Sequence, residues 1–155
     1  MGKEINGFLK VWKPTYFQLD YDPAEGYCIN ISLKVNNPCV RKRFLMDYGS
    51  PFCKDVPTTY HKVKPFVDNT KKMYQESLAH YEKALEDKTH KIEALRKNPL
   101  SQHPGSHEYI SIDLLVQDEE GIRWAIKLVK GNISFVEQML GELNEIKQEF
   151  KIKDL

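Results

Sequence analysis

The sequence lacks several features that would assign a class of protein at once. Its three cysteines, Cys28, Cys39 and Cys53, are spaced by 11 and 14 residues, which matches neither a paired disulfide framework nor a CxxC motif. Its apolar runs are too short to cross a bilayer, and residues 1–6 lack the apolar core of a secretory signal. We therefore expect a cytoplasmic protein with reduced thiols and no membrane association.

An excess of one charge is also lacking, because 23 Lys and Arg stand against 22 Asp and Glu. The charges are nevertheless unevenly distributed: residues 1–64 hold ten basic and six acidic residues, and residues 98–155 hold six basic and ten acidic residues. Such asymmetry is compatible with nucleic-acid binding, with head-to-tail association, or with attraction between the two halves of one molecule.

Local catalytic motifs are missing as well. The sequence has no phosphate-cradling glycine loop, no serine-hydrolase elbow and no HExxH. It therefore favours binding over catalysis, and no cofactor is expected. A small hydrolase or nucleotide-processing enzyme, built around loop histidines and turn carboxylates, stays open as a second alternative because spatially assembled sites leave no local motif.

Metal donors are present only as weak candidates. Cys39, Cys53, His103 and His107 supply the donor types that zinc prefers, but their spacing fits no metal motif. A loop with two histidines is usually solvated, so we expect no metal.

A long amphipathic helix is the clearest feature that is present. Residues 66–97 contain no Gly and no Pro, carry 13 charged residues, and place apolar side chains at three- and four-residue intervals. At 1.5 Å per residue such a helix is about 48 Å long.

Alternating apolar residues predict two β-hairpins. Residues 16–35 contain two alternating segments around Asp22-Pro23-Ala24-Glu25-Gly26, and residues 110–128 contain two more around Asp118-Glu119-Glu120-Gly121. After Gly131, Ser134 and Glu137 match a capping box that would begin a helix over about 135–150.

These elements predict one α+β domain over residues 1–155. We expect two antiparallel β-hairpins to form a four- to five-stranded sheet. The long helix (about 66–97) and the C-terminal helix (about 135–150) should cover one face of it, because each element has one apolar face.

The apolar stripe of the long helix is a candidate surface for a partner or for self-association, including a homodimer. Its residues recur in a heptad-like pattern, which suits pairing with another helix in the same chain or in a second one. They are Tyr74, Leu78, Tyr81, Leu85, Ile92 and Leu95.

A mixture of basic and aromatic residues near the N-terminus is the alternative binding site. Cations that follow phosphates and aromatic rings that stack on bases together hold single-stranded DNA or RNA. The candidates are Lys10, Trp12, Lys13, Tyr16, Arg41, Lys42, Arg43 and Phe44.

The sequence thus favours a non-enzymatic protein that binds a macromolecule. The leading hypothesis is a protein–protein interaction module, such as an adaptor, an assembly factor or an inhibitor, that uses the long helix and the open sheet face. A viral or mobile-element origin is compatible with its size, although no residue demonstrates it. Single-stranded nucleic-acid binding is the alternative.

Overall fold

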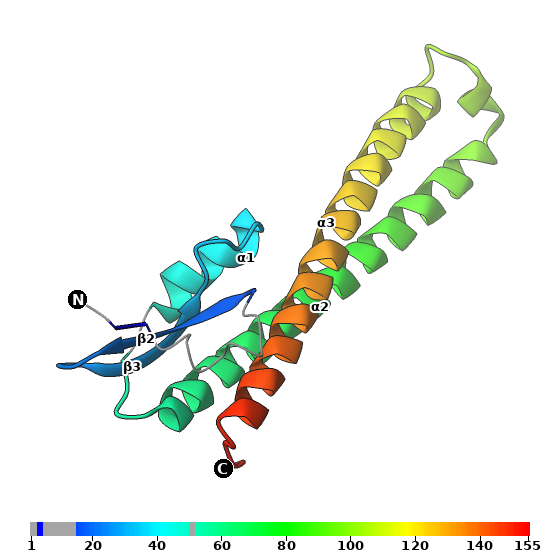
Figure 1. The fold of residues 1–155 in the computed structure, drawn as a ribbon. Coiled ribbons are helices and arrows are strands. Elements are labelled where there is room, and N and C mark those ends of the chain that lie inside the picture. The colour runs from blue at the N-terminus through cyan, green and yellow to red at the C-terminus, as the bar shows by residue number, and fades with distance from the viewer. Residues whose placement is uncertain (1–2, 5–14, 50–51) are drawn as a thin grey trace. The chain divides into compact units, whose positions relative to one another are not determined.

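The computed structural model describes residues 3–4, 15–49 and 52–155. The chain forms two compact units (Figure 1). The first comprises residues 1–72 and 132–155, and we call it the sheet unit. The second comprises residues 73–131, and we call it the helical hairpin.

The sheet unit contains a small antiparallel sheet with the order β1-β2-β3. Strands β2 (Phe17–Asp22) and β3 (Gly26–Ile31) form a hairpin in which Phe17 faces Ile31, and β1 (Lys3–Glu4) adds two residues beside β2. In the turn, the Asp22 side chain accepts a hydrogen bond from the Ala24 N–H at 2.8 Å. The hairpin predicted within residues 16–35 is thus present.

Gly26 closes this turn in a conformation that requires glycine. Its φ is +101°, and a Cβ there would lie 2.1 Å from the carbonyl oxygen of Cys53. The close approach exists because Tyr27 and Cys53 exchange two backbone hydrogen bonds, of 2.6 and 2.7 Å. The turn therefore holds the segment before the first long helix against the sheet.

Two short helical segments follow the sheet. Helix α1 (Pro38–Arg43) begins at Asn37, whose side chain accepts a hydrogen bond from the Val40 N–H at 3.1 Å. The π-helical segment η2 (Phe44–Tyr48) continues from it and ends at Gly49. They bring Phe44 into contact with the aromatic rings of Phe17, Tyr48 and Phe66.

Helix α2 (Val56–Arg96) begins where Asp55 caps it, with the Asp55 carboxylate accepting from the Thr58 N–H at 2.8 Å and from the Thr58 hydroxyl at 2.6 Å. These hydrogen bonds lower the pKa of Asp55. A 3-10 turn, η3 (Pro99–Gln102), connects α2 to α3 (His107–Glu149), whose first turn is capped by the Ser106 hydroxyl.

The core of the sheet unit joins the sheet to the first turns of α2 and the last turns of α3. Ile29 donates its backbone N–H to the Thr59 hydroxyl at 3.0 Å, which ties β3 to α2. The fully buried side chains are mostly aliphatic and aromatic, as expected for close packing. They include Phe17, Leu19, Ile29, Ile31, Val40, Phe44, Val63, Val67, Met139, Leu143 and Ile146.

Glu142 is a buried carboxylate that binds the start of β2. It accepts backbone N–H groups from Thr15, from Tyr16 at 2.7 Å and from Phe17 at 2.9 Å. Burial raises the pKa of Glu142, and the three hydrogen bonds oppose that shift. The carboxylate therefore binds three successive backbone N–H groups where the chain enters β2.

The predicted four- to five-stranded sheet is wrong, since residues 110–128, expected as a second hairpin, lie inside α3. Ile110, Ile112, Leu114 and Val116 do alternate, but they belong to two different sides of one helix. A helix that is apolar on both sides imitates the period of a strand. The supposed turn residues 118–121 are helical too.

The predicted bounds of both helices are also corrected. Helix α2 begins ten residues before the predicted start, because Pro57 falls in the first turn, where no N–H donor is needed, and Pro65 is tolerated inside the helix. The C-terminal helix begins at His107 rather than near 135, so Ser134 does not cap it. The sequence also suggests irregular structure over residues 37–64 with a short strand at residues 43–48, whereas the structure has helical segments at Pro38–Arg43 and Phe44–Tyr48.

Gly121 gives a direct test of whether residues 118–121 are helical rather than a turn. Nothing lies within 4 Å of a Cβ at Gly121, so Gly121→Ala should raise the free energy of unfolding by about 0.5–1 kcal/mol through its better helix propensity. Gly26→Ala should lower it because the new methyl meets Cys53. Denaturant unfolding at low protein concentration measures both. A loss of stability for Gly121→Ala would favour the turn at residues 118–121 that the sequence predicts over the helix.

The role of Glu142 is tested by Glu142→Gln. An amide has one acceptor oxygen and turns an NH₂ group toward N–H donors, so we expect a loss of about 1–3 kcal/mol in the free energy of unfolding. The exposed neighbour Glu145, changed to Gln, should alter stability by less than about 0.5 kcal/mol. Equal effects of the two substitutions would contradict the anchoring role.

Candidate interaction surface

Two polar contacts fix how α2 and α3 pair within the helical hairpin, where they run side by side in opposite directions (Figure 1). The Thr89 hydroxyl donates to the Glu119 carboxylate at 2.6 Å, and Lys88 Nζ lies 3.4 Å from Asp118 Oδ2. Glu119 is nearly buried, so its interaction with Thr89 is shielded from water. These contacts select one register of the two helices.

The predicted association stripe lies on the covered side of α2. Tyr74 and Ile92 are buried, and Leu78, Tyr81, Leu85 and Leu95 are half-buried. Leu85 lines a cleft together with Ile126 of α3, so this side of α2 faces the other helix of the same hairpin. The stripe therefore has a partner inside the chain.

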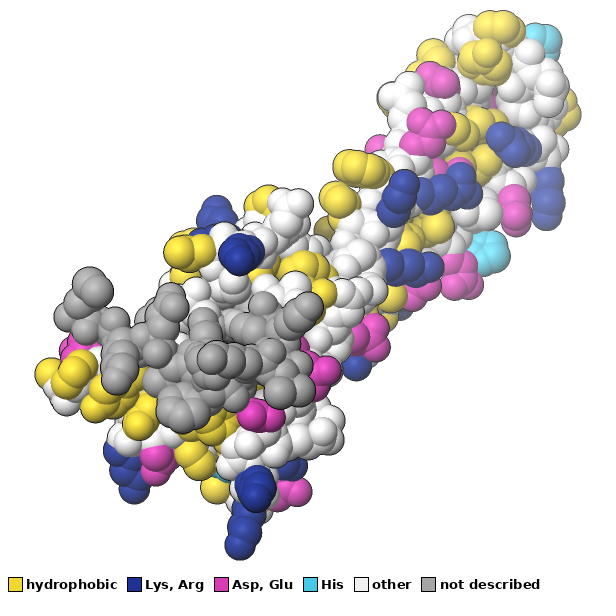
Figure 2. Space-filling view, viewed as in Figure 1, with side chains coloured by type: hydrophobic (Ala, Val, Ile, Leu, Met, Phe, Trp, Pro, Cys, Tyr) yellow, Lys and Arg dark blue, Asp and Glu magenta, His cyan; other side chains and the backbone are white. Residues whose placement is uncertain are grey.

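The other side of α3 carries large apolar side chains that are exposed. Ile110, Leu114, Trp124 and Leu128 are 51%, 56%, 59% and 51% exposed. Figure 2 shows hydrophobic side chains at the surface of the helical hairpin, interspersed with charged ones. Together with Gln117 and Gly121 these residues recur at intervals of four and three, and we call this set of six the outer face of α3.

An exposed apolar row of this length calls for an explanation. Single exposed apolar residues are normal, but here two pairs of large apolar side chains, separated by Gln117 and Gly121, lie on one face of one helix, and a clustering of this kind is typical of an interaction site. Tryptophan is the residue type most often responsible for binding energy in interfaces. The outer face of α3 is therefore the strongest candidate interaction surface among the described residues.

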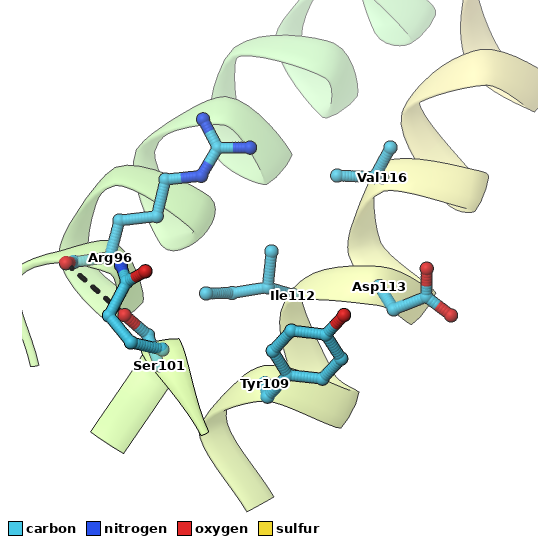
Figure 3. A pocket seen from close by; sticks show the side chains of 7 residues that line it. Arg96, Ser101, Tyr109, Ile112, Asp113 and Val116 are labelled. Atoms are coloured by element: carbon cyan, nitrogen blue, oxygen red, sulfur yellow. Dashed lines mark hydrogen bonds between the residues drawn. The ribbon is translucent and has the colours of Figure 1, made fainter. Parts of the chain in front are cut away.

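A shallow cleft of about 320 Å³ lies at the end of the helical hairpin (Figure 3). Arg96 comes from the end of α2, and Tyr109, Ile112 and Asp113 come from the beginning of α3, with the Ser101 hydroxyl hydrogen-bonded to the Arg96 carbonyl at 3.4 Å. The cleft offers a cation, a carboxylate and an apolar floor.

The residues proposed for nucleic-acid binding do not form one surface in the described part of the chain. Phe44 is buried in the core, Arg41 donates to the Ser32 carbonyl at 2.9 Å, and Arg43 pairs with Asp47 at 3.2 Å. Tyr16 donates its hydroxyl to Gln138, and its ring packs edge-on against Phe135. Lys42 is exposed. Lys10, Trp12 and Lys13 lie outside the described residues.

The candidate metal donors are not grouped for coordination. His103 and His107 are exposed, Cys39 is exposed on α1, and Cys53 is buried beside the sheet. Across residues 3–4, 15–49 and 52–155, no group of three His, Cys, Asp or Glu side chains is arranged to hold a metal ion.

The buried thiol and phenol nearest the sheet are poorly suited to nucleophilic chemistry. Burial raises the pKa of Cys28 to about 12, with smaller contributions from Asp20 and Cys53, so the thiol is protonated at neutral pH. Burial also raises the pKa of Tyr48 above its usual value. The carboxylates expected in a second turn lie on α3, where Asp118 and Glu119 already contact α2.

Comparisons with known proteins give no match: none was found among protein-family models, curated proteins or solved structures. Within the described residues, no helix is both long and apolar enough to span a membrane. Function is therefore argued from the surfaces of this chain alone.

Sequence reasoning missed the outer face because it assigned these residues to a hairpin. A helical interpretation of residues 107–131 places Ile112, Val116 and Ile126 on one side, and Leu114 and Trp124 on the other. The signal was the combination of two apolar rows in one segment without proline.

The covered position of the α2 stripe is tested by comparing two substitutions in the same helix. Leu78→Asp puts a carboxylate on the covered side and should cost about 1–3 kcal/mol of unfolding free energy. Lys83→Asp, on the exposed side, should cost less than about 0.5 kcal/mol. Thermal unfolding followed by circular dichroism measures both, and equally small losses would show that the stripe is exposed.

Proposed function

We propose that this protein is a non-enzymatic protein–protein interaction module, of the kind that serves as an adaptor, assembly factor or inhibitor, and that it binds through the outer face of α3. One observation carries the proposal. Four large apolar side chains stand exposed in a row on a helix whose opposite side is already covered. Water contact of such a row is unfavourable, and docking against another helix removes it.

The mode of binding follows from the helical spacing. Residues at intervals of three and four present knobs that fit between the side chains of a partner helix. Trp124 is the expected anchor, since burying an indole contributes more than burying any other side chain in the row. The cleft near Arg96 and Asp113 adds a polar contact point at the end of the hairpin.

The proposal predicts that Leu114→Asp strongly weakens binding without unfolding the protein. Leu114 is exposed, so its replacement costs only helix propensity and a like-charge contact with Asp118, and it should lower the unfolding free energy by no more than about 1 kcal/mol. A charge in the buried centre of an interface should weaken binding by at least about 30-fold, the equivalent of roughly 2 kcal/mol. Ser134→Asp, also exposed on α3, adds the same charge away from the outer face.

The measurement has two stages. Proteins that co-purify from native cells with the wild type and with Ser134→Asp, but not with Leu114→Asp, are identified. Their binding is then measured by calorimetry with purified components. Unchanged binding of every retained protein to Leu114→Asp would refute the proposed surface.

A further inference from the structure

The occupant of the outer face is indicated by the charges on the same segment of α3. Residues 107–120 carry five acidic side chains and no Lys or Arg, whereas residues 121–131 carry three basic side chains and no acid. The acidic ones are Glu108, Asp113, Asp118, Glu119 and Glu120, and the basic ones are Arg123, Lys127 and Lys130. Within the chain Asp118 lies 3.4 Å from Lys88, and Glu119 lies 3.9 Å from Arg123, so these charges are already paired. The other charges still change sign from one end of the segment to the other, so two copies that run in opposite directions are complementary.

The outer face also has the spacing of a helix-pairing seam. Its six residues occupy alternating positions four and three apart over about 27 Å, the pattern that lets two helices interlock side chains. In an antiparallel pair, position 110 meets 128 of the other copy, 114 meets 124, and 117 meets 121. Every large apolar residue then faces another large apolar residue.

We propose that the outer face of α3 binds a second copy of this chain, with the two α3 helices antiparallel in that register. The inference rests on the proposed function and names the partner of the same surface. A twofold axis passes near residue 119, so each contact occurs twice.

Charged residues beside the seam select this orientation. In the antiparallel pair, Asp113 of one copy lies beside Lys127 of the other, and this attraction occurs twice. In a parallel pair, Asp113 would instead lie beside Asp118, which repels it. Glu120 faces its own counterpart near the axis in the antiparallel pair, and that repulsion opposes association.

Gly121 fits the same arrangement. A glycine inside a helix costs stability relative to alanine, and nothing within 4 Å in the chain itself requires it there. In the antiparallel register it lies opposite Gln117 of the other copy, next to the axis where the helices approach most closely. Because Gly121 has no side chain, the longer side chain of Gln117 from the other copy has room there.

Self-association is measured on the full-length chain by sedimentation equilibrium from about 1 to about 300 µM, which includes the micromolar range of small interfaces. We expect a monomer–dimer equilibrium. Leu114→Asp should raise the dissociation constant by at least about 30-fold, and Ser134→Asp should leave it within about twofold. A monomer throughout this range, or a dimer that Leu114→Asp leaves intact, would overturn the inference.

Orientation is tested by exchanging charges. Asp113→Lys and Lys127→Asp each place like charges side by side twice, so each should weaken the dimer by roughly tenfold at low salt. The double variant Asp113→Lys/Lys127→Asp restores opposite charges and should recover wild-type affinity. Failure of this rescue, or tighter association of Asp113→Lys alone, would overturn the antiparallel register.

Glu120→Gln provides a test with the opposite sign. It removes the repulsion at the axis, so the dimer should tighten by a few-fold. An unchanged or weaker dimer would contradict the placement of the axis.

The two proposals fail in different ways. If the wild type stays monomeric but a different protein binds it and is lost with Leu114→Asp, the interaction surface stands and the second copy is excluded as its occupant. If Leu114→Asp changes neither self-association nor any other binding, the proposed function fails as well.

Discussion

The bond between Glu142 and the start of β2 is the constraint on which the sheet unit depends. It joins the first long strand to the last turns of the last helix, across 125 residues of sequence to Phe17. Of the three hydrogen bonds, the one from the Phe17 N–H is buried, and leaving a buried donor unpaired costs about 1–3 kcal/mol. A short hairpin is marginal by itself, so this anchor and the apolar core beneath it hold the sheet in place.

Helix α3 serves two structural purposes along its length. In the sheet unit its apolar side chains, such as Val136 and Leu143, belong to the core. In the helical hairpin one side is covered by α2 and the other is exposed. Among the described residues, α2 covers one apolar side of residues 110–128 and leaves the other exposed to water.

The fold was partly predictable from the sequence. The hairpin around Gly26 and the existence of the long helix followed from local periodicity and turn residues, which act over a few positions. The bounds of α2 did not follow, because Pro57 and Pro65 normally end a helix and are here compatible with one. The second hairpin was wrong because alternation over four residues cannot separate a strand from a helix with two apolar rows.

The candidate site was harder to predict than the fold because it depends on which faces of α2 and α3 are covered by another helix and which are exposed. The α2 stripe has the more regular spacing, yet it faces α3, and only the three-dimensional pairing shows this. The exposed row on α3 was visible as residues but was assigned to the wrong element. No pattern in the sequence indicates that Glu142 anchors β2, since its three partners are backbone groups more than a hundred residues away.

The acidic residues 118–120 of α3 differ in their surroundings: some contact α2 and one is exposed on another side of the helix. Asp118 and Glu119 contact Lys88 and Thr89 of α2, so their charges are engaged in setting the hairpin register. Glu120, one residue further, lies about 100° around the helix and is exposed. Asp113 and Lys127 lie on that same side, next to the apolar row. The internal contacts therefore fix α2 against α3, and the remaining charges are those that can select the orientation of a second helix.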